Sequence, residues 1–192
     1  MALDLQEALK IALDVSPLDQ KKCYGAADGV PLGVGLFYKG IRFPIFNLDD
    51  NLYDTVQGYV YILTHECDID QGNRRPFNED ILICPILPFE DFLEDVVNIL
   101  SEESQKSFVD AVAKRSVNKL IYVPPLGDEL ANGGVLNLNR IGSSHVSCFD
   151  KRQNANAEVI GCLTDYGLRQ MDNALENHLL RPKTSLLPMV LN

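Results

Sequence analysis

Short apolar runs bounded by glycine, proline and polar residues recur along the chain and predict a β-rich fold. These runs are rich in aromatic and β-branched side chains, which favour strands. The segments predicted as strands are 36–38, 41–46, 57–65, 81–86, 120–123, 135–139 and 144–149. Lys39 and Gly40 are predicted to form the turn between the first two, and Pro44 restricts the second to a sheet edge or a bulge. Consecutive short strands with hairpin-like connections favour a small antiparallel barrel over a parallel βαβ sheet.

Helical periodicity marks both ends of the chain and one internal segment. Leucine and alanine recur on one face of residues 2–13, and apolar residues repeat with helical spacing from Phe89 to about Lys114. Thr164 is predicted as the N-cap of a last helix, which Pro182 ends. We therefore expect a mainly β fold with α additions, in a single domain spanning 1–192. Its predicted parts are an N-terminal helical segment at 1–24, barrel strands at 30–88 and 119–163, a helical insertion at 89–118 and a C-terminal helix at 164–181.

A strand-like run at 59–63 is followed closely by a cluster of residues that bind metals, carry protons or attack electrophiles. The cluster consists of His65, Glu66, Cys67 and Asp68. A strand end is a common place for a functional site, because the scaffold is rigid there and the side chains are exposed. Side chains alternate between faces in an extended chain, so His65 and Cys67 are expected to share one face if the strand continues to residue 67.

Nucleophilic catalysis is one interpretation of this cluster. Cys67 is the candidate nucleophile, and either His65 or His145 is the candidate base. Asp68 or Glu66 would orient the imidazole, as the third member of a catalytic triad does. The candidate catalytic residues are therefore His65, Cys67, Asp68 and His145.

A zinc site is an alternative interpretation. His65, Cys67, His145 and Cys148 supply two imidazoles and two thiolates, a set that completes a tetrahedral zinc ion. The spacings H-x-C and H-x-x-C are not combined in an established zinc module, and a surface histidine with two buried cysteines also explains them. The run 68–73 begins like a calcium loop but has Asn78 where that loop needs glutamate, which favours a polar turn.

Composition limits the classes of function. The chain has 27 acidic and 17 basic side chains and a formal charge of -10, which argues against a general nucleic-acid surface because phosphate binding relies on Lys and Arg. Its five cysteines are widely spaced and include no C-x-x-C pair, which favours a reducing compartment over a disulfide framework. We find neither a signal peptide pattern nor an apolar run of membrane-spanning length, so we expect a cytoplasmic protein.

The order and spacing of the predicted strands from Gly58 to Arg181 resemble those of the MazF/PemK-like toxin family. The matching segments are the strands at 58–64, 80–87 and 135–143, the strand and proline loop at 120–126, and the helix at 164–180. The resemblance implies an SH3-like barrel with a C-terminal helix. It also implies a bacterial toxin–antitoxin or anti-phage context, and a barrel of a kind that often forms homodimers.

The resemblance also indicates where ribonuclease chemistry is expected. Family ribonucleases have an Arg-Pro pair in the first strand and a Thr or Ser after the second, and here Gly58-Tyr59 and Leu87 stand at these positions. A barrel without its catalytic pair can keep its fold and change its function. We therefore expect a divergent, non-ribonucleolytic member that binds a protein partner or a ligand at the rim formed by residues 65–68. The alternatives are an enzyme that uses Cys67 or has kept RNA cleavage through other residues, and a zinc-stabilised interaction module.

Overall fold

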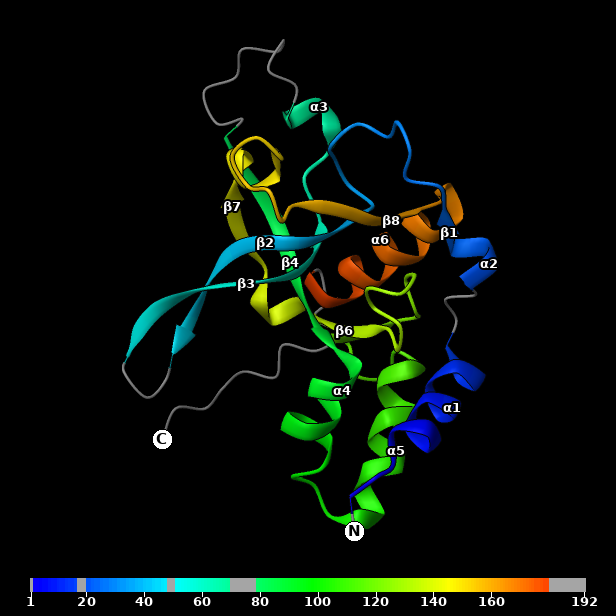
Figure 1. Ribbon diagram of the computed structural model, residues 1–192. Coiled ribbons are helices and arrows are strands. Elements are labelled where there is room, and N and C mark those ends of the chain that lie inside the picture. Colours follow the sequence, from blue (N-terminus) through cyan, green and yellow to red (C-terminus); the bar gives the residue numbers. More distant parts are fainter. Residues whose placement is uncertain (1, 17–19, 48–50, 70–78, 180–192) are drawn as a thin grey trace, which may run out of the picture.

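The fold is an antiparallel sheet with helices packed below it and along one side (Figure 1). A computed structural model describes residues 2–16, 20–47, 51–69 and 79–179. The strands are β1 (Tyr24–Gly25), β2 (Leu36–Asn47), β3 (Leu52–Ile62), β4 (Asp80–Pro88), β5 (Leu120–Val123), β6 (Gly134–Asn137), β7 (Gly142–His145) and β8 (Glu158–Leu163). They pair in the order β1-β8-β2-β3-β4-β6-β5, with β7 beside β4, so this sheet is open. The expectation of a mainly β fold with α additions is confirmed at this level.

The longer helices lie near the two ends of the chain and between β4 and β5, and shorter helical elements follow β3, β6 and β7. They are α1 (Leu5–Val15), α2 (Gln20–Cys23), α3 (Glu66–Ile69), α4 (Phe89–Phe92), the π-helix η2 (Leu93–Val97), α5 (Glu102–Ala113), the 3-10 turns η3 (Leu138–Arg140) and η4 (Val146–Phe149), and α6 (Asp165–Leu179). The helix predicted from Phe89 to Lys114 is therefore interrupted by a π-helical turn and by residues 98–101.

The strand β2 runs without interruption through Lys39 and Gly40, where the sequence predicts a turn. The register between β2 and β3 shifts between Tyr38 and Ile41, and Gly40 has a φ of 70°. Glycine reaches a positive φ at little cost, so the chain forms a β-bulge here instead of a turn. Pro44 pairs only with β3, since β8 covers β2 no further than Lys39, and its predicted edge position is confirmed.

The strand β3 ends at Ile62, although the sequence predicts that it continues to His65. The amide of Leu63 still donates to the carbonyl of Leu82 at 2.9 Å. The amide of Leu82, however, donates to Thr64 Oγ1 at 2.7 Å. A side-chain oxygen thus replaces a backbone acceptor, the ladder stops, and the chain is free to turn into α3.

The strand β4 organises the middle of the molecule, because three strands pair with it. One edge pairs with β3. The other edge is divided between β7, which pairs with residues 80–83, and β6, which pairs with residues 86–88. The turn η3 separates β6 from β7, and it starts where the side chain of Asn137 accepts from the amide of Asn139 at 3.1 Å. The strand predicted at 144–149 ends at His145, because residues 146–149 form η4.

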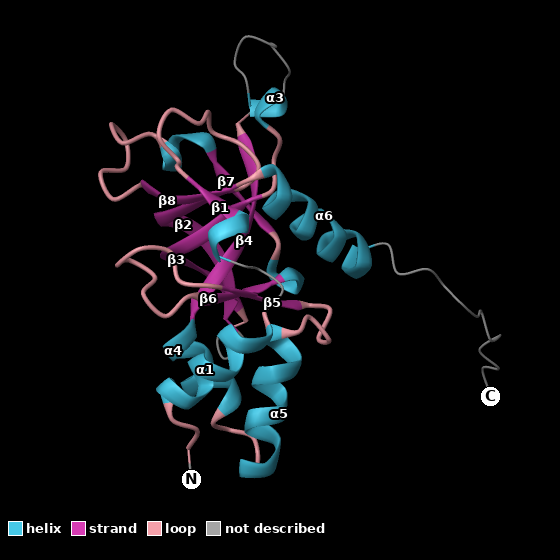
Figure 2. Ribbon diagram, turned by 90° about the vertical axis from the view of Figure 1, so that its right-hand side faces the viewer, coloured by secondary structure: helices cyan, strands magenta, loops and turns pink. Residues whose placement is uncertain are grey.

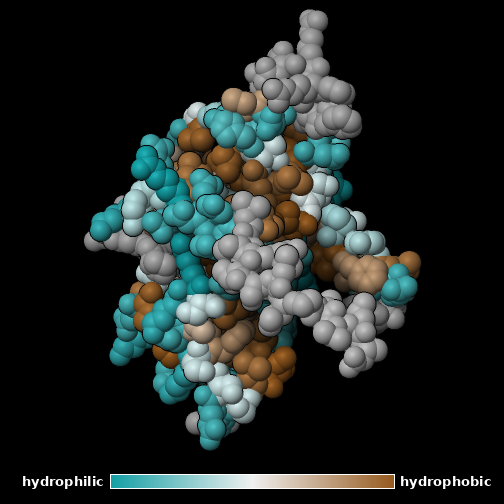
Figure 3. Space-filling model, turned by 180° about the vertical axis from the view of Figure 1, so that it is seen from behind, coloured by the Kyte–Doolittle hydropathy of each residue, from teal (hydrophilic) through white to brown (hydrophobic). Residues whose placement is uncertain are grey.

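Helices cover two parts of the sheet. The helices α1, α4, η2 and α5 pack at the lower end around Phe89, Phe92 and Tyr122. The helix α6 runs along the side of the sheet (Figure 2) and covers a core that includes Phe37 and Tyr61. Seen from behind, apolar side chains remain visible over the sheet and again over the lower helices (Figure 3).

Thr164 caps α6, as the sequence predicts. Its Oγ1 accepts from the amide of Gly167 at 3.2 Å, and its hydroxyl donates to the carbonyl of Lys22 at 2.6 Å. The cap therefore also ties α6 to α2. All five cysteines are free thiols. Among the described residues, no helix combines the length and the apolar character needed to cross a bilayer.

Candidate functional site

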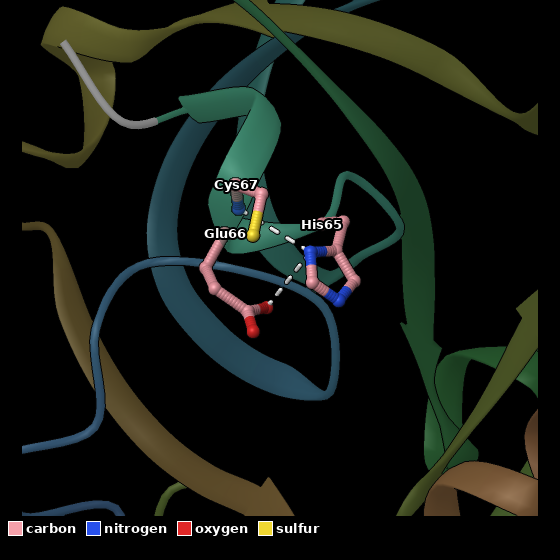
Figure 4. A group of neighbouring side chains, drawn as sticks. All are labelled: His65, Glu66 and Cys67. Carbon is pink, nitrogen blue, oxygen red and sulfur yellow. Dashed lines mark hydrogen bonds and ion pairs between the residues drawn. The ribbon is translucent and has the colours of Figure 1, made fainter. Parts of the chain in front are cut away.

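His65, Glu66 and Cys67 form an exposed polar cluster where β3 gives way to α3 (Figure 4). His65 precedes the first residue of α3, and its Nδ1 accepts from the backbone amide of Cys67 at 3.3 Å. Its carbonyl oxygen accepts from the amide of Asp68 at 2.9 Å. These bonds satisfy amides at the start of a helix, as an N-cap does. The local turn therefore brings the three side chains together.

The prediction that His65 and Cys67 share a strand face is wrong, because β3 ends before either residue. Glu66 is expected on the opposite face of such a strand, yet its Oε2 lies 3.4 Å from His65 Nδ1. Asp68 contributes its amide to the turn, and its carboxylate does not belong to the group of neighbouring ligand atoms.

The Nδ1 of His65 has two partners that require different protonation states. It accepts from the Cys67 amide only when it carries no proton, and it pairs with Glu66 only when it carries one. The side chains of His65 and Glu66 are 56% and 45% exposed, so water weakens the ion pair. A general base for Cys67 would have to accept the proton of its thiol, whereas the hydrogen bond to the His65 imidazole comes from the backbone amide of Cys67. This hydrogen bond therefore gives no direct support for His65 as the base of a Cys67 nucleophile.

The cluster has the residue types and the spacing of a partial metal site. One ligand atom from each of the three residues lies within 4.8 Å of the others. Ligand atoms around tetrahedral zinc are roughly 3.5 Å apart, because the metal–ligand bonds are about 2.0–2.3 Å long. The three exposed side chains would have to close by roughly 1 Å, which surface rotamers permit. The residues present therefore fit an open, three-ligand site, with the fourth position left to solvent or substrate.

His145 and Cys148 lie apart from this cluster. His145 pairs across one edge of β4, whereas the chain that leads to His65 runs along the other edge. In the described part of the chain, the only close group of three or more possible ligands is His65, Glu66 and Cys67. The predicted four-ligand zinc site of His65, Cys67, His145 and Cys148 is therefore not formed, because β4 separates the two pairs.

His145 has partners of its own. Its Nδ1 lies 2.7 Å from Ser147 Oγ and also accepts from the Ser147 amide at 3.2 Å, while its Nε2 lies 3.5 Å from the Glu79 carboxylate. A serine, an imidazole and a carboxylate are the components of a hydrolytic triad. Here the hydroxyl and the amide of the same serine share one nitrogen, which is how a side chain caps η4. His145 and Cys148 also line a shallow pocket of about 290 Å³ beside Arg42.

Several pockets along β3 and β4 share lining residues and extend to the lower helices, and we call them together the sheet–helix groove. It consists of three adjoining pockets of about 430, 560 and 170 Å³. The residues that line both of the first two pockets are Gln57, Gly58 and Tyr59, and those that line both of the last two are Leu87, Val96, Val135 and Asn137. The groove therefore crosses β3 and β4 and ends against the helices.

The charged residues of the sheet–helix groove differ along its length. At one end Lys39 is held by Glu129 at 2.6 Å and by Glu158 at 2.9 Å. Hydrogen bonds to these two carboxylates raise the pKa of Lys39, so its positive charge is already balanced. In the middle, Asp91 comes from α4 and Asp95 from η2.

The other side of the middle pocket carries one cation, and the far end of the groove is mainly apolar but also carries Lys119. Arg140 reaches the middle pocket from η3. No ion pair of Arg140, Asp91 or Asp95 is found within the described residues, so these charges face the groove and solvent. The rings of Phe92 and Phe108 line the last pocket.

The sequence analysis does not include Asp91, Asp95 or Arg140 among the candidate residues. Asp91 and Asp95 are four positions apart, and residues with this spacing lie on the same side of a helix. This spacing is the feature of the sequence that could have indicated them. The π-helical turn that places Asp95 and Val96 beside the sheet cannot be predicted from the sequence, because π-helical turns are rare and short. Comparisons of the chain with protein-family models, with curated proteins and with solved structures found no match.

Proposed function

We propose that the protein is a divergent MazF/PemK-like protein whose strands keep the order of that family's SH3-like barrel in an open sheet, that it binds a protein partner in its sheet–helix groove, and that it does not cleave RNA. One observation carries this proposal. Gly58 and Leu87, which the resemblance aligns with the two catalytic positions of the family, lie 29 residues apart in sequence and line the same pocket of about 560 Å³. A pocket that lacks both the guanidinium and the hydroxyl at these positions is suited to binding without cleavage. The toxin–antitoxin or defence context is part of the proposal and derives from the resemblance.

The charges in the groove favour a protein segment with apolar and basic side chains over RNA. Asp91 and Asp95 would repel phosphates, and Arg140 is the only cation among the residues that line the middle pocket. The apolar end of the groove would accept aliphatic or aromatic side chains of the same segment. In an alternative form of this proposal, the protein partner is a second copy of the same chain, which binds at this surface to form a homodimer.

We expect the purified protein to leave single-stranded and structured RNA intact. We also expect it to bind a synthetic peptide of alternating Leu and Lys more tightly than a matched peptide of Leu and Glu. The double variant Asp91→Asn/Asp95→Asn should weaken binding of the Leu/Lys peptide by roughly tenfold, because two desolvated charge contacts are lost. Fluorescence anisotropy of labelled peptides measures both affinities.

A matched control is the variant Asp28→Asn/Asp128→Asn, which removes two exposed acids outside the groove and the same net charge. Equal losses in the two double variants would show that net charge alone, and not the groove, attracts the peptide. RNA cleavage that disappears in Arg140→Ala would contradict the proposal outright.

Metal binding at His65, Glu66 and Cys67 is a second candidate function, and the cluster of ligand atoms within 4.8 Å favours it. We expect the protein to bind Zn²⁺ with one ion per chain, and Cys67→Ala to weaken binding by roughly tenfold or more. The variant His145→Ala/Cys148→Ala should bind as the parent does, since these residues lie on the other edge of β4. Isothermal titration with zinc measures each affinity, and equal affinities of the parent and Cys67→Ala would exclude this site.

A further inference from the structure

The strands β2 and β3 continue beyond the rest of the sheet as a two-stranded arm (Figure 1). The arm consists of residues 41–47 of β2 and 52–58 of β3. The strand β4 pairs with β3 only from Tyr59 to Ile62. Within the described ranges, therefore, only β2 pairs with residues 52–58, and the other edge of this segment is open. An open strand edge presents backbone N–H and C=O groups that can pair with another chain.

Pro44 shows which backbone groups of β3 point to the open edge. Opposite residues in an antiparallel pair alternate between those that exchange two hydrogen bonds and those that exchange none. Pro44 lies opposite Thr55 and has no N–H, so these two residues form a pair without hydrogen bonds. The N–H and C=O of Thr55 therefore point away from β2. Because the strand repeats every two residues, the same groups of Tyr53 and Gln57 point that way too.

The open edge is the one along which β4 runs further up the strand. The amide of Leu63, which is an even number of positions after Thr55, donates to the carbonyl of Leu82 at 2.9 Å just past the ladder between β3 and β4. Residues 53, 55 and 57 therefore face the side on which β4 lies. Continued by one step, the register of β3 with β4 would place Pro88 opposite Gln57.

The strand β4 ends at Pro88 for a local reason. Pro88 has no N–H to donate, and the amide of Phe89 donates to the carbonyl of Gly133 at 3.1 Å. The chain then turns into α4. In the part of the chain that the structure describes, the line of β4 beside residues 53–57 is therefore not continued by any strand.

The two edges of the arm differ in their protection against pairing. On β2, Pro44 faces outward without an N–H, and the carbonyl of Arg42 accepts from Ser144 Oγ at 2.8 Å. On β3, residues 52–58 include no proline, lysine or arginine, although proline and lysine are residues that natural proteins use to protect an edge. The one charged side chain of this segment, Asp54, accepts from Asn47 Nδ2 at 2.9 Å.

The open edge leads into the sheet–helix groove. Gln57 and Pro88 both line its middle pocket, together with Asp91 and Asp95. A strand that followed the line of β4 beside β3 would therefore lie close to these two acids, which favour basic side chains on it. A second copy of the chain would instead bring its own formal charge of -10 to an acidic surface. The charges therefore favour a different protein as the source of the strand.

We propose that the protein partner enters the sheet–helix groove as an extended strand and pairs with β3 at residues 53–57. This inference rests on the function proposed above and adds how the partner is held. Each of the three outward-facing residues supplies one donor and one acceptor, and these bonds give affinity with little dependence on sequence. Alternate side chains of the added strand would lie on the two faces of the arm, which is why we expect alternating apolar and basic residues.

The faces of the arm offer apolar contacts to such a strand. On one face, the ring centroids of Phe46 and Tyr53 are 5.2 Å apart, and these side chains are 42% and 74% exposed. On the other face, Phe43 lies opposite Val56. The strand would therefore cover an exposed aromatic pair in addition to forming backbone hydrogen bonds.

Hydrogen exchange of single amides, followed by NMR on the full chain with the alternating Leu/Lys peptide, tests the pairing. We expect saturating peptide to slow the exchange of the amides of Tyr53, Thr55 and Gln57 by roughly tenfold or more. The amides of Asp54 and Val56 face β2 by the same alternation, so their exchange should change much less.

Two N-methylated forms of the peptide give a second test. One form is methylated at every Leu amide and the other at every Lys amide, so each lacks the N–H groups along one edge of the peptide strand. Pairing with β3 uses a single edge, so one form should bind more weakly than the other by roughly tenfold or more. Fluorescence anisotropy of the labelled peptides measures both affinities.

A pair of variants at Thr55 tests the same edge from the side of the protein. Thr55→Pro removes an N–H that points away from β2, so the ladder with β2 is kept and the circular dichroism spectrum should match that of the parent. Its affinity for the peptide should fall by roughly tenfold or more. Thr55→Val keeps the N–H and is the matched control, which should bind as the parent does.

The outcomes separate this inference from the function on which it rests. Peptide binding without slower exchange at residues 53, 55 and 57, or equal affinities of the two methylated forms, would overturn the strand pairing and leave binding in the groove intact. If the unmodified peptide did not bind at all, the proposed function would fail and this inference with it. A dimer of the chain that Thr55→Pro dissociates would show that the edge pairs with a second copy, which contradicts the proposal.

Discussion

Replacing Gly40 with alanine is expected to destabilise the fold by roughly 3–5 kcal/mol, a large fraction of the stability of a domain of this size. Two effects add at this position. The φ of 70° costs an L-residue about 1–2 kcal/mol. A Cβ atom would also collide with the carbonyl group of Asn156, with its carbon 2.6 Å away and its oxygen nearer still. The backbone of the bulge cannot move away easily, because the carbonyl of Gly40 accepts from Asn154 and from Gln57, each at 2.8 Å.

Gly127→Ala is the matched control for this prediction. Gly127 has a similar φ of 60°, but a Cβ there would meet no atom within 4 Å. Its replacement by alanine should lower the free energy of unfolding only by the cost of the positive φ, about 1–2 kcal/mol. Urea unfolding of the three proteins measures the difference, and equal losses for the two variants would show that the bulge does not clamp Gly40 against Asn156. Since Gly40 also lines the sheet–helix groove, the variant should bind the Leu/Lys peptide less tightly.

The bulge at Gly40 also illustrates what the sequence could and could not predict. The pair Lys39-Gly40 predicts a break in a strand, and the structure has a bulge there, because both flanking segments pair with the same strand β3. The break is a local property of glycine, whereas the choice between turn and bulge depends on which strand lies alongside. Pro44 and Thr164 were predictable for the same reason, since the effects of a missing N–H and of a capping hydroxyl are local.

The candidate site was less predictable, because its geometry depends on single contacts between distant residues. The residue types at 65–67 indicate a polar cluster, and the structure has one. Its form was missed, because the hydroxyl of Thr64 takes the amide of Leu82 and ends the strand three residues early. The separation of His145 from His65 likewise depends on β7 pairing with the far edge of β4. No property of either histidine's neighbours in sequence encodes that pairing.

Alkaline pH is expected to destabilise the protein by several kcal/mol, and Cys84 is a main cause. Its side chain is fully buried in β4, and burial raises the pKa of the thiol from 9.0 to about 12, although a hydrogen bond with the backbone of Asn137 partly opposes this. The folded state therefore holds the thiol proton more tightly than the unfolded state does. The stabilisation is complete below pH 9 and is lost as pH rises towards 12, at about 1.4 kcal/mol per pH unit and up to about 4 kcal/mol in all. Burial also raises the pKa of Tyr61 and Tyr122, which adds to the loss above pH 10.

The contribution of Cys84 can be isolated by comparing two variants that lack the thiol and differ in packing. Cys84→Ser keeps a small polar group, whereas Cys84→Ala leaves a cavity, so their stabilities at neutral pH should differ. Between pH 9 and pH 12, however, both should lose less stability than the parent by the same amount, up to about 4 kcal/mol. Urea unfolding across this pH range measures how steeply the free energy of unfolding falls with pH in the parent and in each variant. If both variants lost stability as steeply as the parent, the buried tyrosines alone would account for the alkaline transition, and the thiol of Cys84 would titrate alike in the folded and unfolded chains.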